Sequence, residues 1–151
     1  MKLSKNFTLA EIEHSSTAKR LGISNEMPKK HIDNMQRLIT DLVQPMRNDL
    51  GPIRISSGYR SKALNSAIGG SNRSQHSKGQ ALDLQFWEMG KMSNEKIYKW
   101  ILESDLQFDQ MINEFDFSWI HLSLKETGNR RSVLEAYKDK EGYTAYRHAD
   151  I

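Results

Sequence analysis

Residues 74–84 read SQHSKGQALDL, and this stretch contains the pattern on which both the fold and the candidate site depend. It places a histidine, His76, seven positions before an acidic residue, Asp83. Side chains of a β-strand alternate between its two faces. Residues 81–86 (ALDLQF) show that alternation, because their leucines and phenylalanine fall on one face while Asp83 falls on the other. The stretch therefore predicts a strand with one buried apolar face and one polar face.

A second stretch, residues 118–124 (SWIHLSL), repeats this arrangement with a histidine. Its isoleucine and leucines alternate with His121, so His121 also lies on the polar face of a predicted strand. Two histidines and one carboxylate form the ligand set of a catalytic zinc that leaves its fourth position to water. His76, Asp83 and His121 are therefore candidate ligands of one zinc ion on the polar side of a sheet.

Each candidate ligand also has an ordinary structural explanation when it is taken alone. His76 lies in a polar loop, as surface histidines do, and His121 suits a hydrogen-bonded position within a sheet. Asp83 suits the cap of a turn, or an ion pair with Arg54 or Arg60. The residues by themselves leave these alternatives open.

Length and composition restrict the classes of protein that need to be considered. The chain has 151 residues, enough for one domain with its own core. It has no cysteine, so disulfides, thiolate zinc sites and cysteine nucleophiles are excluded. Its net charge of +3 is small and its basic residues are scattered, which argues against nucleic acid as a partner. Charged residues make up 27% of the chain, an ordinary fraction, so a globular domain is the default expectation.

The N-terminal stretch MKLSKNFTLAEIEHS lacks the continuous apolar run of a signal peptide. No other segment is apolar enough for us to expect insertion into a membrane. We therefore expect synthesis in the cytoplasm, and as a separate expectation we take the protein to be a monomer. An activity outside the membrane would then require that something else releases the protein.

Helix signals dominate the first third of the chain. A capping-box pattern at Thr8 predicts a short helix. A long helix with an apolar stripe is expected to begin at Pro28 and to kink or break near Pro45. Serines in an N-cap context predict two shorter helices, after Ser61 and Ser93.

Strand signals follow the long helix and are separated by turn residues. The predicted strands lie at residues 53–56, 81–86, 108–114 and 119–124. Helices flanking a small antiparallel sheet predict an α+β fold. We expect residues 1–151 to form a single domain with its core at about residues 7–137 and a polar tail at 138–151. An edge strand is expected near Val133 and Tyr137, and the end from Asp139 is expected to be loosely held.

Three motifs together resemble the zinc D-alanyl-D-alanine peptidases of family M15. They are SGYRS at residues 57–61, SQHSKGQALDL at 74–84 and WIHLS at 119–123. The likeness covers roughly residues 7–131 and is similar to the family's short, single-domain bacterial and phage branch. Vancomycin-resistance dipeptidases and the hedgehog signalling domain belong to the same clan. The resemblance implies a small zinc peptidase whose substrate is the stem peptide of peptidoglycan.

The resemblance also implies roles for particular residues. His76, Asp83 and His121 match the family's zinc ligands. Arg60 matches the arginine that polarises the scissile carbonyl group or holds the substrate. Ser74 matches the serine that lies beside the substrate in relatives.

The general base is the position at which the chain departs from many relatives. These place a glutamate three residues before the last histidine ligand, where this chain has Ser118. Others place the acid at the end of the preceding strand, and Glu114 matches that arrangement. Asp116, five residues before His121, is the competing candidate. We favour Glu114.

Two aromatic residues are candidates for substrate contact. Trp119 lies on the same predicted strand face as His121, and Tyr59 lies in the turn next to Arg60. Trp87 is a weaker candidate, because aromatic residues in strands usually belong to the core. The other histidines have no partners in the sequence and are predicted to lie at the surface: His14, His31 and His148.

These observations predict a zinc metallopeptidase that cleaves peptidoglycan, either as a D-alanyl-D-alanine carboxypeptidase or as a cross-link endopeptidase. A phage or prophage lysis enzyme, acting on the cell wall after release, fits the expected absence of a signal peptide. The alternative is a catalytically inactive, zinc-stabilised module that binds the cell wall or belongs to a virion. The unusual position of the acid keeps that alternative open.

Overall fold

The computed structural model describes residues 1–150, and its first third is helical because caps and apolar spacing favour helices there. Helix α1 (Leu9–Glu13) begins at Thr8, whose side chain accepts a hydrogen bond from the backbone N–H of Glu11. The Glu11 side chain accepts one from Thr8 in return, so the predicted capping box is confirmed. Helix α2 (Ser16–Leu21) follows, capped by Ser15.

The long helix is interrupted by a π-helical turn close to Pro45, where a kink or break was predicted. It consists of α3 (Lys29–Leu38), a π-helical turn (Ile39–Val43) and α4 (Gln44–Leu50). The wider π turn lies directly before Pro45, where it accommodates a ring that would clash with an ordinary helical turn. The predicted stripe is core, since its central members are fully buried: Met35, Leu38, Ile39, Leu42, Val43 and Met46.

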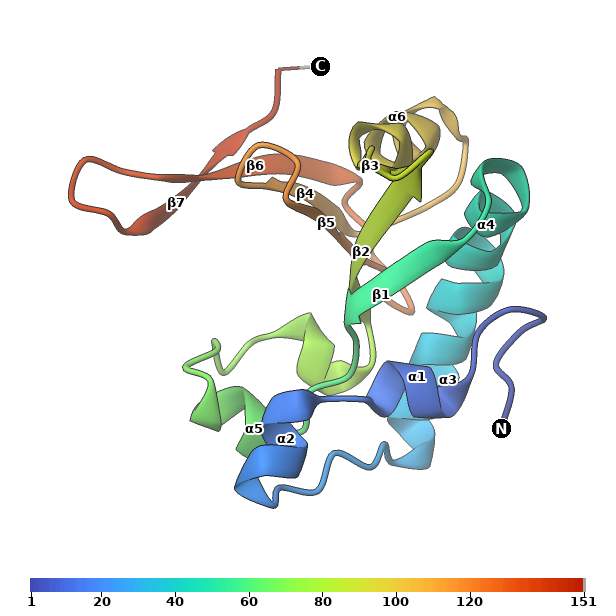
Figure 1. Ribbon diagram of the computed structural model, residues 1–151, viewed down its shortest axis with the longest axis vertical. Helices are drawn as coiled ribbons and strands as arrows, with labels where there is room; N and C mark the ends of the chain where they lie inside the picture. Colours follow the sequence, from blue (N-terminus) through green and yellow to red (C-terminus); the bar gives the residue numbers. More distant parts are fainter. Residues whose placement is uncertain (151) are drawn as a thin grey trace.

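Within residues 1–150, the strands form one seven-stranded sheet, and the predicted α+β fold is confirmed (Figure 1). The strands are β1 (Ile53–Ser57), β2 (Ala81–Glu88), β3 (Lys91–Met92), β4 (Gln110–Glu114), β5 (Trp119–Ser123), β6 (Ser132–Lys138) and β7 (Thr144–His148). Their order is β1-β2-β5-β4-β6-β7, with β3 paired to β2. The sheet is antiparallel except that β4 and β6 run parallel.

The two faces of the sheet have the composition that strand alternation predicted. Leu82 and Leu84 of β2, and Ile120 and Leu122 of β5, belong to the buried core. The core also contains residues of the long helix and of α6 (Glu95–Glu103). The opposite face of the sheet carries Asp83 and His121, which are direct register partners.

Two shorter helices complete the fold, and one begins later than predicted. Ser61 caps α5 (Lys62–Ala67) as expected. Helix α6 has Asn94 rather than Ser93 as its N-cap residue. The buried Asn94 side chain accepts a hydrogen bond from the backbone N–H of Phe86 and donates to the carbonyl of Phe117. Asn94 therefore connects β2 to the turn between β4 and β5. None of the helices within residues 1–150 is long and apolar enough to cross a membrane.

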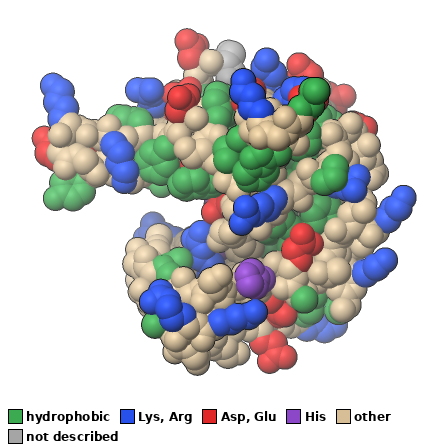
Figure 2. All heavy atoms as spheres, in the orientation of Figure 1, with side chains coloured by type: hydrophobic (Ala, Val, Ile, Leu, Met, Phe, Trp, Pro, Cys, Tyr) green, Lys and Arg blue, Asp and Glu red, His purple; other side chains and the backbone are tan. Residues whose placement is uncertain are grey.

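The C-terminal segment forms a hairpin instead of the loosely held end that was expected from Asp139. Strand β6 lies between β4 and β7 and is therefore not an edge strand. The Asp139 carboxylate accepts hydrogen bonds from the backbone N–H groups of Glu141 and Tyr143, which fixes the turn. Ile151, the last residue of the predicted tail, lies outside the described residues. Figure 1 shows the hairpin projecting as an arm. The space-filling view in Figure 2 shows a hollow between this arm and the rest of the molecule.

Candidate metal centre and surrounding cavity

Neighbouring strands and one short helix bring the three predicted ligands together. Asp83 and His121 lie directly opposite each other on β2 and β5. His76 comes from a 3-10 helix (Gln75–Lys78), whose N-cap is Ser74. The Ser74 hydroxyl accepts a hydrogen bond of 3.2 Å from the backbone N–H of His76. Ser74 therefore helps to fix the position of His76.

Gly79 links this short helix to β2 through a backbone conformation that requires glycine. Its φ angle is +70°, in the left-handed region that residues with a Cβ atom rarely adopt. A Cβ atom at Gly79 would also lie 2.3 Å from the backbone oxygen of His31 on α3. The glycine in SQHSKGQALDL thus lets the loop that carries His76 pack directly against the long helix.

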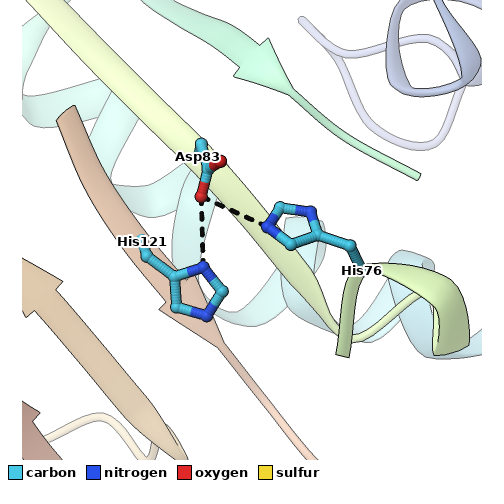
Figure 3. A group of neighbouring side chains, drawn as sticks. All are labelled: His76, Asp83 and His121. Carbon is cyan, nitrogen blue, oxygen red and sulfur yellow. Dashed lines mark hydrogen bonds and ion pairs between the residues drawn. The ribbon is translucent and has the colours of Figure 1, made fainter. Parts of the chain in front are cut away.

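The three side chains converge on a single point (Figure 3). Nε2 of His76 lies 3.2 Å from Oδ1 of Asp83. Nδ1 of His121 lies 3.1 Å from the same oxygen. One ligand atom from each residue falls within 4.8 Å of the others, a spacing that can hold a metal ion.

The protonation states of His76 and Asp83 suit metal binding. Burial lowers the pKa of His76, which favours the neutral imidazole even though Asp83 acts in the opposite direction. Its Nδ1 lies 2.8 Å from the carbonyl oxygen of Gly58, so the N–H belongs on Nδ1 and the Nε2 lone pair faces Asp83. Burial alone would raise the pKa of Asp83, but its contacts with His76 and His121 lower it overall. Neutral imidazole and ionised carboxylate are the forms that a divalent metal requires.

Arg60 contacts the other side of the Asp83 carboxylate. Its Nη2 donates to Oδ2 of Asp83 at 3.3 Å, and its Nε donates to the Ser57 hydroxyl at 3.1 Å. This is one of the two ion pairs that the sequence left open for Asp83. A guanidinium has five N–H donors, so these two contacts leave others for a ligand.

A cavity of about 690 Å³ surrounds the three side chains and is open to solvent. Most of the residues predicted for the site line this cavity: Arg60, Ser74, His76, Asp83, Glu114, Trp119 and His121. Trp119 is half-buried, and its ring packs against that of Phe115 at a centroid distance of 5.6 Å. Trp87 does not line the cavity and is 38% exposed.

The structure separates the two acids that competed for the role of general base. Glu114 lines the cavity and is buried, whereas Asp116 is exposed in the turn and does not line it. Burial raises the pKa of Glu114, and the negative charge of Asp83 raises it further, while His121 and Arg60 oppose this effect. The Ser118 hydroxyl donates a hydrogen bond of 2.7 Å to the carbonyl of Phe115 and so stabilises the turn between β4 and β5.

Tyr59 does not reach the cavity, which corrects the prediction that it contacts substrate. It is 5% exposed and belongs to the hydrophobic core. The cause is the close approach of the preceding backbone to α1, where the N–H of Tyr59 donates to the carbonyl of Ile12 at 2.9 Å. The Tyr59 hydroxyl lies 3.1 Å from Nδ1 of His31, so His31 is half-buried and not the surface residue that was expected. His14 and His148 are exposed, as predicted.

Other parts of the cavity carried no recognisable signal in the sequence. Leu134, Thr144 and Tyr146 of the C-terminal hairpin line it, because the sheet order places this hairpin beside β4. Asp109 does not line the cavity, but it binds Gln75, which does. Its fully buried carboxylate accepts hydrogen bonds from Arg130 at 2.8–3.2 Å and from Gln75, next to His76, at 3.1 Å. Its local sequence gives no sign of these partners, which lie 21 and 34 residues away.

Comparison with known proteins agrees with this geometry. The profile of the family described as Peptidase M15 matches residues 5–123, well over half of the chain. A search of curated proteins finds no significant match. Members of the M15 family are typically metallopeptidases, and the matched residues contain the complete cluster of His76, Asp83 and His121. This chain belongs to the peptidase M15 family.

Proposed function

We propose that this protein is a zinc-dependent peptidase of peptidoglycan stem peptides, acting as a D-alanyl-D-alanine carboxypeptidase or as a cross-link endopeptidase. One observation carries the proposal: three convergent ligand atoms share a solvent-open cavity with a buried glutamate. A non-catalytic metal site would need only the three ligands. The additional acid in the same cavity favours hydrolysis.

His76, Asp83 and His121 would hold the metal, and the second oxygen of Asp83 would keep its contact with Arg60. A bound zinc ion supplies Lewis acidity, which makes water a stronger nucleophile at neutral pH and polarises a carbonyl group. Zinc is the expected ion because imidazole and carboxylate ligands in a three-residue set suit it.

Glu114 is the residue that we assign to proton transfer. Its carboxylate accepts a proton from the attacking water and then donates that proton to the amine that leaves when the peptide bond breaks. A raised pKa suits both steps, because the group must gain and lose a proton near neutral pH. The position of Arg60 allows its free N–H groups to bind the carbonyl oxygen of the scissile bond or a carboxylate of the substrate.

The net charge of +3 suits an anionic cell-wall polymer as the larger substrate. We propose a lysis enzyme of phage or prophage origin as the cellular setting, in which the monomer reaches the wall after release. Digestion of intact walls from several bacterial types would test this setting.

The decisive experiment is a digest of purified peptidoglycan followed by mass analysis of the products. Wild type is compared with Glu114→Ala, and Asp116→Ala serves as the matched control, because Asp116 lies two residues away but outside the cavity. Each protein is first loaded with zinc, and its metal content is measured. We expect Glu114→Ala to retain zinc and lose activity, while Asp116→Ala keeps both.

The products distinguish the possible activities. Release of free alanine indicates a carboxypeptidase, whereas shortened cross-links indicate an endopeptidase. Equal activity of wild type and Glu114→Ala would refute the assignment of Glu114. If zinc-loaded wild type binds walls of several types without cutting any, the protein is a wall-binding module and the proposed activity is wrong.

A further inference from the structure

The β6–β7 hairpin forms a wall of the cavity, although it lies beyond the residues matched by the family profile. The match ends at residue 123, whereas the hairpin strands are Ser132–Lys138 and Thr144–His148. Leu134, Thr144 and Tyr146 of this hairpin line the cavity. Figure 2 shows hydrophobic side chains on the side of the arm that faces the hollow. The residues matched by the family profile therefore do not include this wall.

The register of the sheet places Tyr146 on the same face as Glu114. Tyr146 pairs with Ala136 of β6, Ala136 pairs with Glu114 of β4, and Glu114 pairs with Trp119 of β5. These four residues form one row across the sheet, and all except Ala136 line the cavity. Neighbouring strands are about 4.8 Å apart, so the backbone of Tyr146 lies roughly 10 Å from that of Glu114.

Glu114 and Tyr146 line the same cavity on either side of Ala136, whose side chain is a single methyl group. Ala136 itself is 3% exposed and does not line the cavity. A ligand that contacts both residues therefore passes through the cavity that they share rather than against Ala136. An extended peptide covers about 3.3–3.6 Å per residue, so roughly three residues span this distance.

The environment of Tyr146 agrees with this placement. Burial raises its pKa, and the negative charges of Glu114 and Asp83 raise it further. The phenol therefore stays protonated at neutral pH and can donate a hydrogen bond. The residue is 54% exposed, so its ring has free surface for a ligand.

We infer that Tyr146 is a substrate-contacting residue that binds the peptide about three residues from the scissile bond. The inference rests on the proposed peptidase function and adds a requirement for substrate length. The phenol ring packs against a small aliphatic side chain of the stem peptide, next to Leu134, and its hydroxyl donates to a peptide carbonyl. An alanine-rich peptide of four or five residues is long enough to make both contacts with Tyr146, whereas a dipeptide bound at the scissile bond cannot reach the hairpin.

The test compares a long and a short substrate: a soluble stem-pentapeptide muropeptide and N-acetylated D-alanyl-D-alanine. The variants are Tyr146→Ala and Tyr146→Phe, with Tyr143→Ala as the matched control. Tyr143 lies on the same hairpin and is 72% exposed, but it does not line the cavity. Thermal unfolding of each protein checks that the hairpin change leaves the fold intact.

We expect Tyr146→Ala to raise KM for the pentapeptide about tenfold, the factor that corresponds to about 1.4 kcal/mol of lost binding. The kcat should change little, and cleavage of the dipeptide should be unaffected. Tyr146→Phe should keep most of the affinity, because it retains the ring. Tyr143→Ala should behave as wild type on both substrates.

Two outcomes separate failure of this inference from failure of the proposed function. If wild type cleaves the pentapeptide and Tyr146→Ala has the same KM as Tyr143→Ala, the hairpin is not a substrate wall. If wild type cleaves neither substrate, binding of the pentapeptide muropeptide is measured by calorimetry instead. Weaker binding by Tyr146→Ala alone would then support the contact, and equal binding by all variants would overturn it.

Discussion

Two buried carboxylates lie at opposite ends of the central strand β4, and they differ in how many hydrogen-bond donors surround them. Asp109 precedes the strand and Glu114 ends it. Asp109 is fully buried and is held by Arg130, Gln75 and, at 3.6 Å, Lys125. Burial would raise its pKa, but the hydrogen bonds from Arg130 lower it to about 2.

Glu114 is also buried, yet its carboxylate has no comparable set of donors among residues 1–150. Its pKa is raised by burial and by Asp83, with only partial opposition from His121 and Arg60. A carboxylate with satisfied hydrogen bonds stabilises the fold and holds its negative charge firmly. A buried carboxylate without them destabilises the fold slightly. Its pKa is raised toward neutral pH, which suits a group that gains and loses a proton. The comparison therefore supports our proposal that Glu114 takes part in catalysis, and it indicates a structural role for Asp109.

The largest expected effect is that of Glu114→Gln on activity. Loss of a general base lowers kcat by about 10²–10⁴-fold. The same change should leave the metal-free protein at least as stable as wild type at neutral pH, because it removes a buried charge that lacks partners. Steady-state kinetics and urea unfolding of the metal-free protein measure the two effects. A strong loss of stability would mean that Glu114 is structural, and the contrast with Asp109 would fail.

Asp109→Asn should produce the reverse result, with its main effect on stability. The change removes the charge that accepts two hydrogen bonds from the Arg130 side chain, and hydrogen bonds to a charged group contribute roughly 1.5–3 kcal/mol each. Because the side chains of Lys125 and Arg130 are partly exposed, we expect a total loss of about 2–3 kcal/mol. Chemical denaturation at pH 7 measures this loss. Activity of the folded variant should fall much less than that of Glu114→Gln, and an equal fall would remove the distinction.

Acid unfolding sharpens the same contrast through pH. The folded-state pKa of Asp109, about 2, lies below its ordinary value of 3.8. Its contribution to stability is therefore complete above pH 3.8 and is lost as the pH falls toward about 2. Thermal unfolding of wild type and Asp109→Asn from pH 7 to pH 2 should show a difference in melting temperature that shrinks over this range. A difference that stays constant down to pH 2 would show that the charge is not the cause.

The smallest effect is expected for Lys125→Ala. The ammonium group lies 3.6 Å from Oδ1 of Asp109, and the lysine side chain is 35% exposed. Contacts of this kind contribute at most about 1 kcal/mol. Denaturation in low and high salt should show a small loss that salt reduces further. A loss as large as that of Asp109→Asn would mean that Lys125, rather than Arg130, is the main partner of the carboxylate.

The three candidate ligands could be identified from the sequence because the strand alternation around two of them is local and because their motifs resemble those of family M15. Alternation in residues 81–86 and 119–124 assigns Asp83 and His121 to the polar faces of their strands. The structure pairs these strands with the two residues directly opposite each other. The capping box at Thr8 and the buried stripe of the long helix were predictable for the same reason, since each depends on residues a few positions apart.

The Asp109 network and the hairpin wall could not be predicted in this way. Strand β7 is largely exposed and polar, so it carries no apolar alternation, and backbone pairing with β6 holds it in the sheet. Asp109 has partners 21 and 34 residues away. Tyr59 was misassigned because the docking of its backbone on α1 directs its ring into the core.

The sequence by itself, through its motifs and their resemblance to family M15, identified His76, Asp83 and His121 as candidate metal ligands. It also placed Asp83 and His121 on the polar faces of their strands, because side-chain chemistry and the two-residue period of a strand are local properties. Only the tertiary structure decided which acid shares the cavity with them, which carboxylate is neutralised by partners, and that the hairpin closes one side of the cavity. Those properties depend on strand order and on burial. Burial is set by residues far away in the chain, so the pKa of a carboxylate and the shape of a cavity appear only when the chain is folded.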